Sequence, residues 1–160
     1  MNHNLLRGIL AVAVVGLLPV GLRAESAFLE RFKFSGGIVV ALDFDDGKFI
    51  ADLATDGPFV VHALMRDEAR VASARQAIQE AGVYGKVTCD GYNGRDLPYV
   101  DGLVNLVLCK ASCEVPEAEL MRVLVPGGRL VVEGANGWKK TVKQVPDGLD
   151  EWNQFLHDAD

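Results

Sequence analysis

Positive charge and cysteine are both scarce in this chain of 160 residues. The 16 Lys and Arg residues face 22 Asp and Glu residues, so the formal net charge is −6 and no nucleic-acid partner is expected. Three cysteines (Cys89, Cys109 and Cys113) are too few for a disulfide framework, and one must stay unpaired or pair between chains. Cys109 and Cys113 are close enough in sequence to bridge across a loop, although a pair of small apolar side chains is the favoured interpretation.

Low-complexity tracts and internal repeats are absent as well. Hydrophobic residues make up 49% of the chain and charged residues 24%, which is the composition of a globular protein and excludes wholesale disorder. The length is sufficient for one domain and too short for two full ones.

Only one stretch of the chain resembles a targeting segment, and it lies at the amino terminus. Arg7 precedes the apolar run 9–20, and small residues lead to Ala24. Because the run is too short to span a membrane comfortably, residues 1–24 are predicted to be a signal peptide cleaved after Ala24. The alternative is an uncleaved anchor, which would be the only membrane contact. The remainder, with 14 basic and 22 acidic residues, is expected to be periplasmic or secreted.

Patterns typical of buried strands and of amphipathic helices alternate along the rest of the chain. This alternation predicts right-handed βαβ units on a mostly parallel sheet, in a three-layer α/β fold. Pro126-Gly127-Gly128 is interpreted as a tight turn, and residues 134–148 as a linker or a hairpin. The predicted strands are 38–42, 58–64, 86–89, 103–109 and 129–133, and the predicted helices are 26–34, 48–55, 67–81, 117–124 and 149–157.

Ligands of such sheets bind beyond the carboxyl ends of the strands. The segments predicted to meet there are 43–47, 65–67, 91–96 and 109–114. The first holds three aspartates, and clustered carboxylates suit hard cations, but the spacing of an EF-hand is not met. A solvated acidic turn is therefore favoured over a metal site. His62 is expected to pack under a helix, and Cys109 to belong to the core.

Over residues 36–134 the order of motifs resembles class I S-adenosylmethionine-dependent methyltransferases. The residues that carry this resemblance are Leu97-Pro98-Tyr99, the run Leu103-Val104-Asn105-Leu106-Val107, and the stretch from Glu119 to Leu130 with its Pro-Gly-Gly. The resemblance implies a Rossmann-like, methyltransferase-type sheet, truncated at its C-terminal strands. It also implies S-adenosylmethionine as the cofactor.

The cofactor positions implied by the resemblance depart from the family pattern. Asp43 and Asp45 stand where the first two loop glycines belong, and Gly47 alone matches. Met65 occupies the slot of the ribose-binding acid, with Asp67 two residues on. Asn93 fills the adenine slot, which usually holds Asp. The aspartates would repel the carboxylate of the cofactor by about 1 to 4 kcal/mol, yet they would attract its ammonium and sulfonium charges.

A degenerate cofactor loop is therefore the favoured interpretation, although the resemblance leaves open whether the cofactor still binds. No residue stands out as a catalytic base, so the catalytic residues and the substrate remain unassigned. Whether the chain is an enzyme is also left open.

A narrower resemblance involves the end of the chain. Trp138 to Lys143, Pro146-Asp147, and the stretch from Asp150-Glu151-Trp152 to His157-Asp158-Ala159 are similar to exported bacterial proteins in which a methyltransferase-like domain precedes a β-propeller that resembles pyrroloquinoline-quinone-binding propellers. The implied division is a signal peptide (1–24), a methyltransferase-like domain (25–134) and a junction (135–160) to a downstream propeller. The alternative function is a non-catalytic interaction or structural module attached to that propeller.

Overall fold

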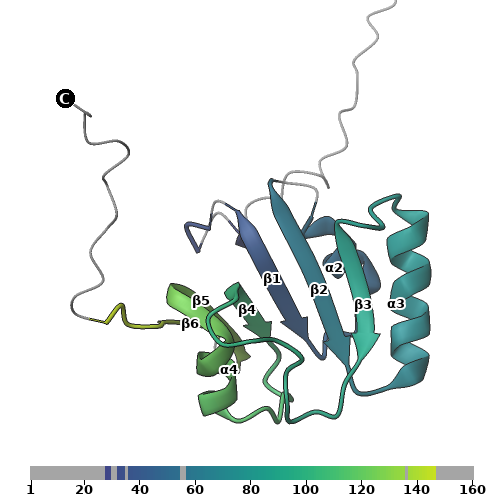
Figure 1. Ribbon diagram of the computed structural model, residues 1–160. Helices are drawn as coiled ribbons and strands as arrows, with labels where there is room; N and C mark the ends of the chain where they lie inside the picture. The colour runs from purple at the N-terminus through teal and green to yellow at the C-terminus, as the bar shows by residue number, and fades with distance from the viewer. Residues whose placement is uncertain (1–27, 30–31, 35, 55–56, 136, 147–160) are drawn as a thin grey trace, which may run out of the picture.

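The computed structural model describes residues 28–29, 32–34, 36–54, 57–135 and 137–146. Within these residues one sheet has the strand order β3-β2-β1-β4-β5-β6 (Figure 1). Strands β1 to β5 are parallel, and β6 runs antiparallel to β5. The elements are β1 (Gly37–Leu42), α2 (Gly47–Asp52), β2 (Phe59–Met65), α3 (Glu68–Glu80), β3 (Val87–Gly91), β4 (Val104–Cys109), α4 (Glu117–Val123), β5 (Leu124–Gly134) and β6 (Gly137–Val142).

Strand β1 lies in the middle of the sheet and is buried on both faces. Its last four side chains are 0% exposed, with Val39 and Ala41 in one core cluster and Val40 and Leu42 in the other. Successive side chains of a strand point to opposite faces, so this run contributes to both layers of the core. Each buried Val or Leu contributes about 1.5 to 3 kcal/mol. The prediction of a doubly buried strand is confirmed.

Helices cover both faces of the sheet, which confirms the three-layer prediction. Ile50 of α2 and Val71 and Ile78 of α3 belong to the cluster on one face. Leu120 and Val123 of α4 belong to the cluster on the other face. Figure 1 shows α3 alongside β3 and α4 near β5.

Acidic caps start both helices that follow β1 and β2. Asp67 accepts a hydrogen bond from Ala69 N (2.8 Å), and α3 then runs to Glu80, close to the predicted end. Asp46 likewise accepts from the backbone at the start of α2. This helix ends at Asp52, earlier than the predicted residue 55.

Pro126-Gly127-Gly128 does not form a turn between two elements, and the prediction there is wrong. The three residues lie inside β5, where the register against β4 shifts so that Val104 faces Leu124 while Leu106 faces Arg129. Strand β6 pairs with β5 over residues 129–142, so the hairpin is observed in place of a linker. The sheet thus continues past residue 134, where the predicted domain ends.

The connection from β3 to β4 is a loop, and this leaves part of β2 open on the α4 side. Val60 is 52% exposed there. His62, on the same face, was expected to lie under a helix, but its ring contacts Tyr99 of the loop: Tyr99 OH lies 2.7 Å from His62 Nδ1. On its other side, His62 Nε2 lies 3.0 Å from Asp90 Oδ2.

The predicted signal peptide (1–24) and the predicted helix at 149–157 lie outside the described residues, and so do residues 26–27 and 30–31 of the predicted helix at 26–34. Leu29, Phe32 and Phe34 are described, and all three are buried in the core cluster under α2 and α3. None of the helices that the structure describes has both the length and the apolar character needed to cross a membrane.

Candidate functional site

Asp43 is the central residue at the carboxyl edge of the sheet. It follows β1, it is only 6% exposed, and its φ of +58° places it in the left-handed region. One carboxylate oxygen accepts from Arg66 N (3.3 Å), and the other lies 3.2 Å from Arg66 Nε and accepts from Tyr92 OH (2.9 Å). Burial raises the pKa of Tyr92, so the phenol stays protonated and donates. The expected solvated acidic turn is therefore wrong for Asp43.

Arg66 extends from Asp43 across the sheet edge toward the loop after β4. Its guanidinium donates to Ser112 O (3.1 Å), and a second nitrogen lies 3.2 Å from Glu114. Because β1 lies between β2 and β4, the side chain crosses the point where the strand order reverses. That point is where open α/β sheets bind their ligands. The side chain of Arg66 therefore bridges the rim of the expected crevice.

Asp45 is exposed, and two cations hold it. Arg70 of α3 pairs with one of its oxygens, and Lys110 Nζ, just after β4, lies 3.0 Å from the other. The hydrogen bond from Lys110 is the largest cause of the lowered pKa of Asp45. This carboxylate is thus already neutralised by the protein.

Gly47, the one glycine that matches the family loop, has a packing role. A Cβ at this position would lie 2.9 Å from Ala77 Cβ and 3.1 Å from Ala74 Cα. Real Cβ atoms rarely approach so closely, so a glycine is needed for α2 to pack against α3. The presence of Gly47 therefore does not depend on a ligand.

The other predicted cofactor residues have structural roles of their own, and of these Asp67 also lies 3.8 Å from Arg70, which pairs with Asp45. The Met65 side chain is 1% exposed and belongs to the core, and Asp67 caps α3. Asn93 Oδ1 accepts from the backbone of Arg95 and Asp96 at 2.8 Å each, which makes a local turn. The structure brings Asp43 and Asp45 to the crevice rim, and it places Met65 in the core.

A cavity of about 480 Å³ lies beside the acidic loop. Phe44 stacks on Phe49, with ring centroids 5.2 Å apart, and on Trp138, with centroids 6.2 Å apart. The cavity joins the carboxyl ends of β1, β4 and β5 to the start of β6. It is lined by Phe44, Asp45, Asp46, Phe49, Lys110, Glu133 and Trp138.

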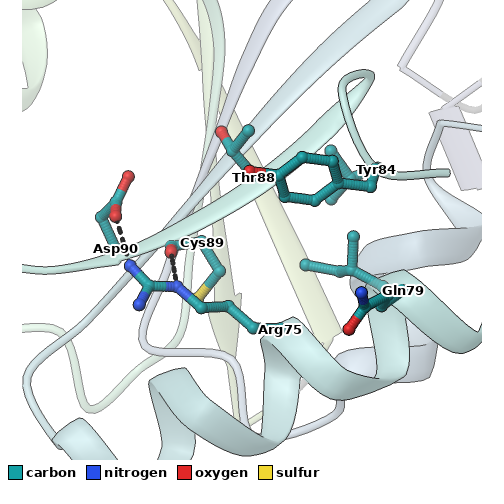
Figure 2. A pocket seen from close by; sticks show the side chains of 8 residues that line it. Arg75, Gln79, Tyr84, Thr88, Cys89 and Asp90 are labelled. Atoms are coloured by element: carbon teal, nitrogen blue, oxygen red, sulfur yellow. Dashed lines mark hydrogen bonds and ion pairs between the residues drawn. The ribbon is translucent and has the colours of Figure 1, made fainter.

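A second cavity, of about 400 Å³, lies away from this edge, between α3 and the outer strand β3. Figure 2 shows Arg75 reaching from α3 to β3. Its Nε donates to Cys89 O (2.8 Å), and Nη2 donates to Asp90 Oδ1 (2.5 Å). Because β3 is an edge strand, the bond to Cys89 O occupies a carbonyl that a further strand would otherwise pair with.

No protein-family profile and no curated protein matches the chain. Among solved structures, it is similar to a SAM-dependent methyltransferase from Aquifex aeolicus (TM-score 0.61, 19% identity, 68% of this chain and 62% of that one). It is also similar to geranyl diphosphate C-methyltransferase from Streptomyces coelicolor A3(2), solved with Mg²⁺, geranyl diphosphate and S-adenosyl-L-homocysteine (TM-score 0.60, 20% identity, 68% of this chain and 44% of that one). A third similar structure is that of the [4+2]-cyclase SpnF (TM-score 0.60, 24% identity, 69% of this chain and 43% of that one).

The chain has the Rossmann-like methyltransferase fold. This confirms the predicted fold class, and the chain spans about half the length of the proteins it resembles. The same fold is found in the cyclase, so the methyltransferase fold by itself does not decide the chemistry.

Two of the positions that the sequence resemblance assigns to S-adenosylmethionine, Met65 and Asp43, are buried. Met65, at the slot that the resemblance gives to a ribose-binding acid, has its thioether side chain in the core. The loop position of Asp43 is filled by a carboxylate that Arg66 and Tyr92 already bind. Among the described residues, no three His, Cys, Asp or Glu side chains gather closely enough to hold a metal ion.

Sequence reasoning did not single out Arg66, Tyr92 or Lys110, although each lies in or directly beside a segment predicted to meet at this edge. The signal available was a cation within two residues of the end of a predicted strand, at both Arg66 and Lys110. What was missing is the pairing, because Asp43 and Arg66 are 23 residues apart and Asp43 and Tyr92 are 49 apart.

Proposed function

We propose that this chain is a methyltransferase-like domain with a degenerate cofactor loop, and that it serves as a non-catalytic module of an exported protein. The observation that carries the proposal is the cluster of Asp43, Arg66 and Tyr92, which is extended by Arg66 to Ser112 and Glu114. The groups that face the expected crevice bind one another.

The energetic argument follows from the burial of Asp43. To admit a ligand, Arg66 would have to leave a carboxylate that is only 6% exposed. Arg66 is partly exposed, but its departure would leave the nearly buried carboxylate with only the bonds from Arg66 N and Tyr92, and this loss of compensation disfavours ligand binding at that position.

Export and attachment to a propeller are parts of the same proposal. Export is supported by residues 1–24, with their short apolar run and small-residue end. Attachment is supported by the likeness of residues 138–143 and 150–159 to a junction that precedes a propeller. Cell fractionation with amino-terminal sequencing tests export, and the expected mature protein is extracytoplasmic and begins at Glu25.

The cavity beside Phe44 supports a second candidate, a methyltransferase that still binds its cofactor in an altered pose. Asp46 and Glu133 line it together with aromatic rings, while Lys110 in the same lining is paired with Asp45. The rings and the two acids suit the ammonium and sulfonium charges of S-adenosylmethionine. Under this candidate, the ligand avoids the Arg66 bridge and uses the space between α2 and β6.

Titration calorimetry of the full chain separates the two candidates. S-adenosylmethionine and S-adenosylhomocysteine are titrated up to millimolar concentration, with NAD and ATP as alternative nucleotides. The proposed module gives no heat with any of them, and ligand does not raise the melting temperature of the same sample. Saturable binding of either methionine-derived ligand would establish the second candidate, and saturable NAD or ATP binding would overturn both.

A further inference from the structure

Two of the three cysteines lie on the same side of the sheet, at the rim of the crevice. Cys109 ends β4, and Cys113 follows after the turn that the bond from Cys113 N to Lys110 O closes (2.9 Å). Cys109 Sγ lies 3.4 Å from the same carbonyl oxygen, Lys110 O. Both side chains belong to the cluster under α4, whereas Cys89 belongs to the cluster on the opposite face. Within one chain, therefore, only Cys109 and Cys113 are placed to meet.

Cys113 follows Cys109 by four residues across the closed turn, and the two thiols are chemically unequal. The interaction between the two side chains lowers the pKa of Cys113 and raises the pKa of Cys109. Cys113 is half-buried and Cys109 is buried. The accessible thiol is thus the one that ionises first, and the buried thiol keeps its proton. This is the arrangement of an attacking thiolate with a resolving partner.

We propose that Cys109 and Cys113 form a reversible disulfide when the domain meets a small-molecule disulfide oxidant such as oxidised glutathione. The Cys113 thiolate attacks one sulfur of the oxidant, which forms a mixed disulfide and releases one glutathione thiolate. Cys109 then loses its proton and attacks the Cys113 sulfur, which releases the second glutathione. Two protein thiols are oxidised, and the oxidant is reduced to two thiols.

The modification concerns the crevice because of what the same turn holds. Ser112 O and the Glu114 carboxylate, on either side of Cys113, both bind the guanidinium of Arg66. A bridge from Cys113 to the end of β4 ties this segment to the sheet. The inference does not rest on the proposed function, because it needs neither a cofactor nor its absence.

Tryptic mapping provides a direct test with the full chain. Cleavage after Lys86, Arg95, Lys110 and Arg122 puts each cysteine in a separate peptide: 87–95, 96–110 and 111–122. After equilibration in glutathione buffers from fully reduced to fully oxidised, the remaining thiols are blocked and the digest is analysed without reduction. The expected product is a cross-link between peptides 96–110 and 111–122, which disappears on reduction.

Variants and alkylation rates complete the test. The cross-link persists in Cys89→Ser and is lost in Cys113→Ser, with melting temperatures recorded for both. Under reducing conditions at neutral pH, iodoacetamide modifies Cys113 about tenfold faster than Cys89, because only the thiolate reacts. The proposal is overturned if oxidation stops at glutathionylated Cys113, if Cys89 enters the cross-link, or if the three thiols are alkylated at equal rates. The wild-type digest alone decides the matter if Cys113→Ser does not fold.

Discussion

Glu119 and Arg122 of α4 form a two-point ion pair, in which Arg122 Nε and Nη2 each lie 2.7 Å from a different oxygen of Glu119. The pair also holds the loop that leads into β4. Leu97 N donates to Glu119 Oε1 (2.8 Å), and Arg122 Nη1 donates to Tyr99 O (2.9 Å). The loop that takes the place of a covering helix is therefore anchored by side chains of α4.

Substitution of Arg122→Ala is expected to destabilise the domain, because backbone carbonyls of the loop lose their donor. Arg122→Lys keeps the charge but cannot make the two parallel bonds, so it should recover only part of the loss. The free energy of unfolding in urea measures both. A lysine variant as stable as the wild type would contradict the role given to the forked geometry.

The same pair predicts a dependence of stability on pH. The hydrogen bond from Arg122 is the largest cause that lowers the pKa of Glu119 from 4.5 to about 2. A depressed pKa means that the ionised form stabilises the fold, fully above pH 4.5, and that this contribution is lost as the pH falls to about 2.

The test compares the wild type with Glu119→Gln by urea unfolding at a series of pH values. At neutral pH the variant is expected to be less stable than the wild type. The difference between their free energies of unfolding should decrease steadily as the pH falls from 4.5 to about 2. Glu117→Gln, in the exposed first turn of the same helix, is the matched control. A gap that stays constant down to the lowest pH would show that the carboxylate charge of Glu119 is not what stabilises the fold.

Asp43 predicts a graded pair of substitutions. Asp43→Asn keeps one oxygen that can accept from Arg66 N, and Asn tolerates the positive φ. The amide nitrogen that replaces the second oxygen is a donor, so the bond from Tyr92 OH and the charge opposite Arg66 are weakened or lost. The cost of Asp43→Asn should be about 1 to 2 kcal/mol. Asp43→Ala also loses the acceptor and strains the backbone, and should cost about 2 to 4 kcal/mol. Chemical unfolding ranks the two, and equal stability of both variants would contradict the buried network.

The fold could be predicted where local pattern and tertiary environment agree. The β1 run is apolar and β-branched, as a strand with both faces covered requires. Asp67 is a residue type that favours a helix start, and its side chain caps α3. Pro126-Gly127-Gly128 failed as a turn because the decisive bonds are distant. Gly127 N donates to Lys143 O and Gly128 O accepts from Lys143 N, both at 2.9 Å, so Lys143, the residue directly after β6, keeps the segment paired within the sheet.

Only the location of the candidate site, at the edge of the sheet, could be predicted from the sequence, because it follows from the strand topology. That the segments after β1, β2 and β4 meet at one edge follows from a parallel sheet. The sequence does not show which side chains bind one another there, because the residues of an acidic loop do not reveal whether its carboxylates are solvated or paired. The burial of Asp43 depends on Arg66 and Tyr92, which come from other strands.

Arg75 predicts an effect on self-association. Arg75→Ala removes the bond to Cys89 O and frees the outer edge of β3 for pairing with another chain. Light scattering should show a larger tendency to aggregate, together with a loss of about 1 kcal/mol in stability. Gln76→Ala, an exposed change on the same helix, is the control and should behave as the wild type. Equal light scattering by the two variants would show that Arg75 does not prevent the β3 edge from pairing with another chain.

Gly47 separates a packing role from a cofactor role. Gly47→Ala would place a Cβ 2.9 Å from Ala77 Cβ, so α2 must shift, at a cost of about 1 to 3 kcal/mol. Ala77→Gly alone weakens α3 by about 1 kcal/mol, yet in the double variant it makes room for the new methyl group. Packing therefore predicts that the double variant is more stable than the sum of the two single losses, by a coupling of about 0.5 to 3 kcal/mol. Strictly additive losses would contradict this and would leave Gly47 to be explained by backbone approach to a ligand.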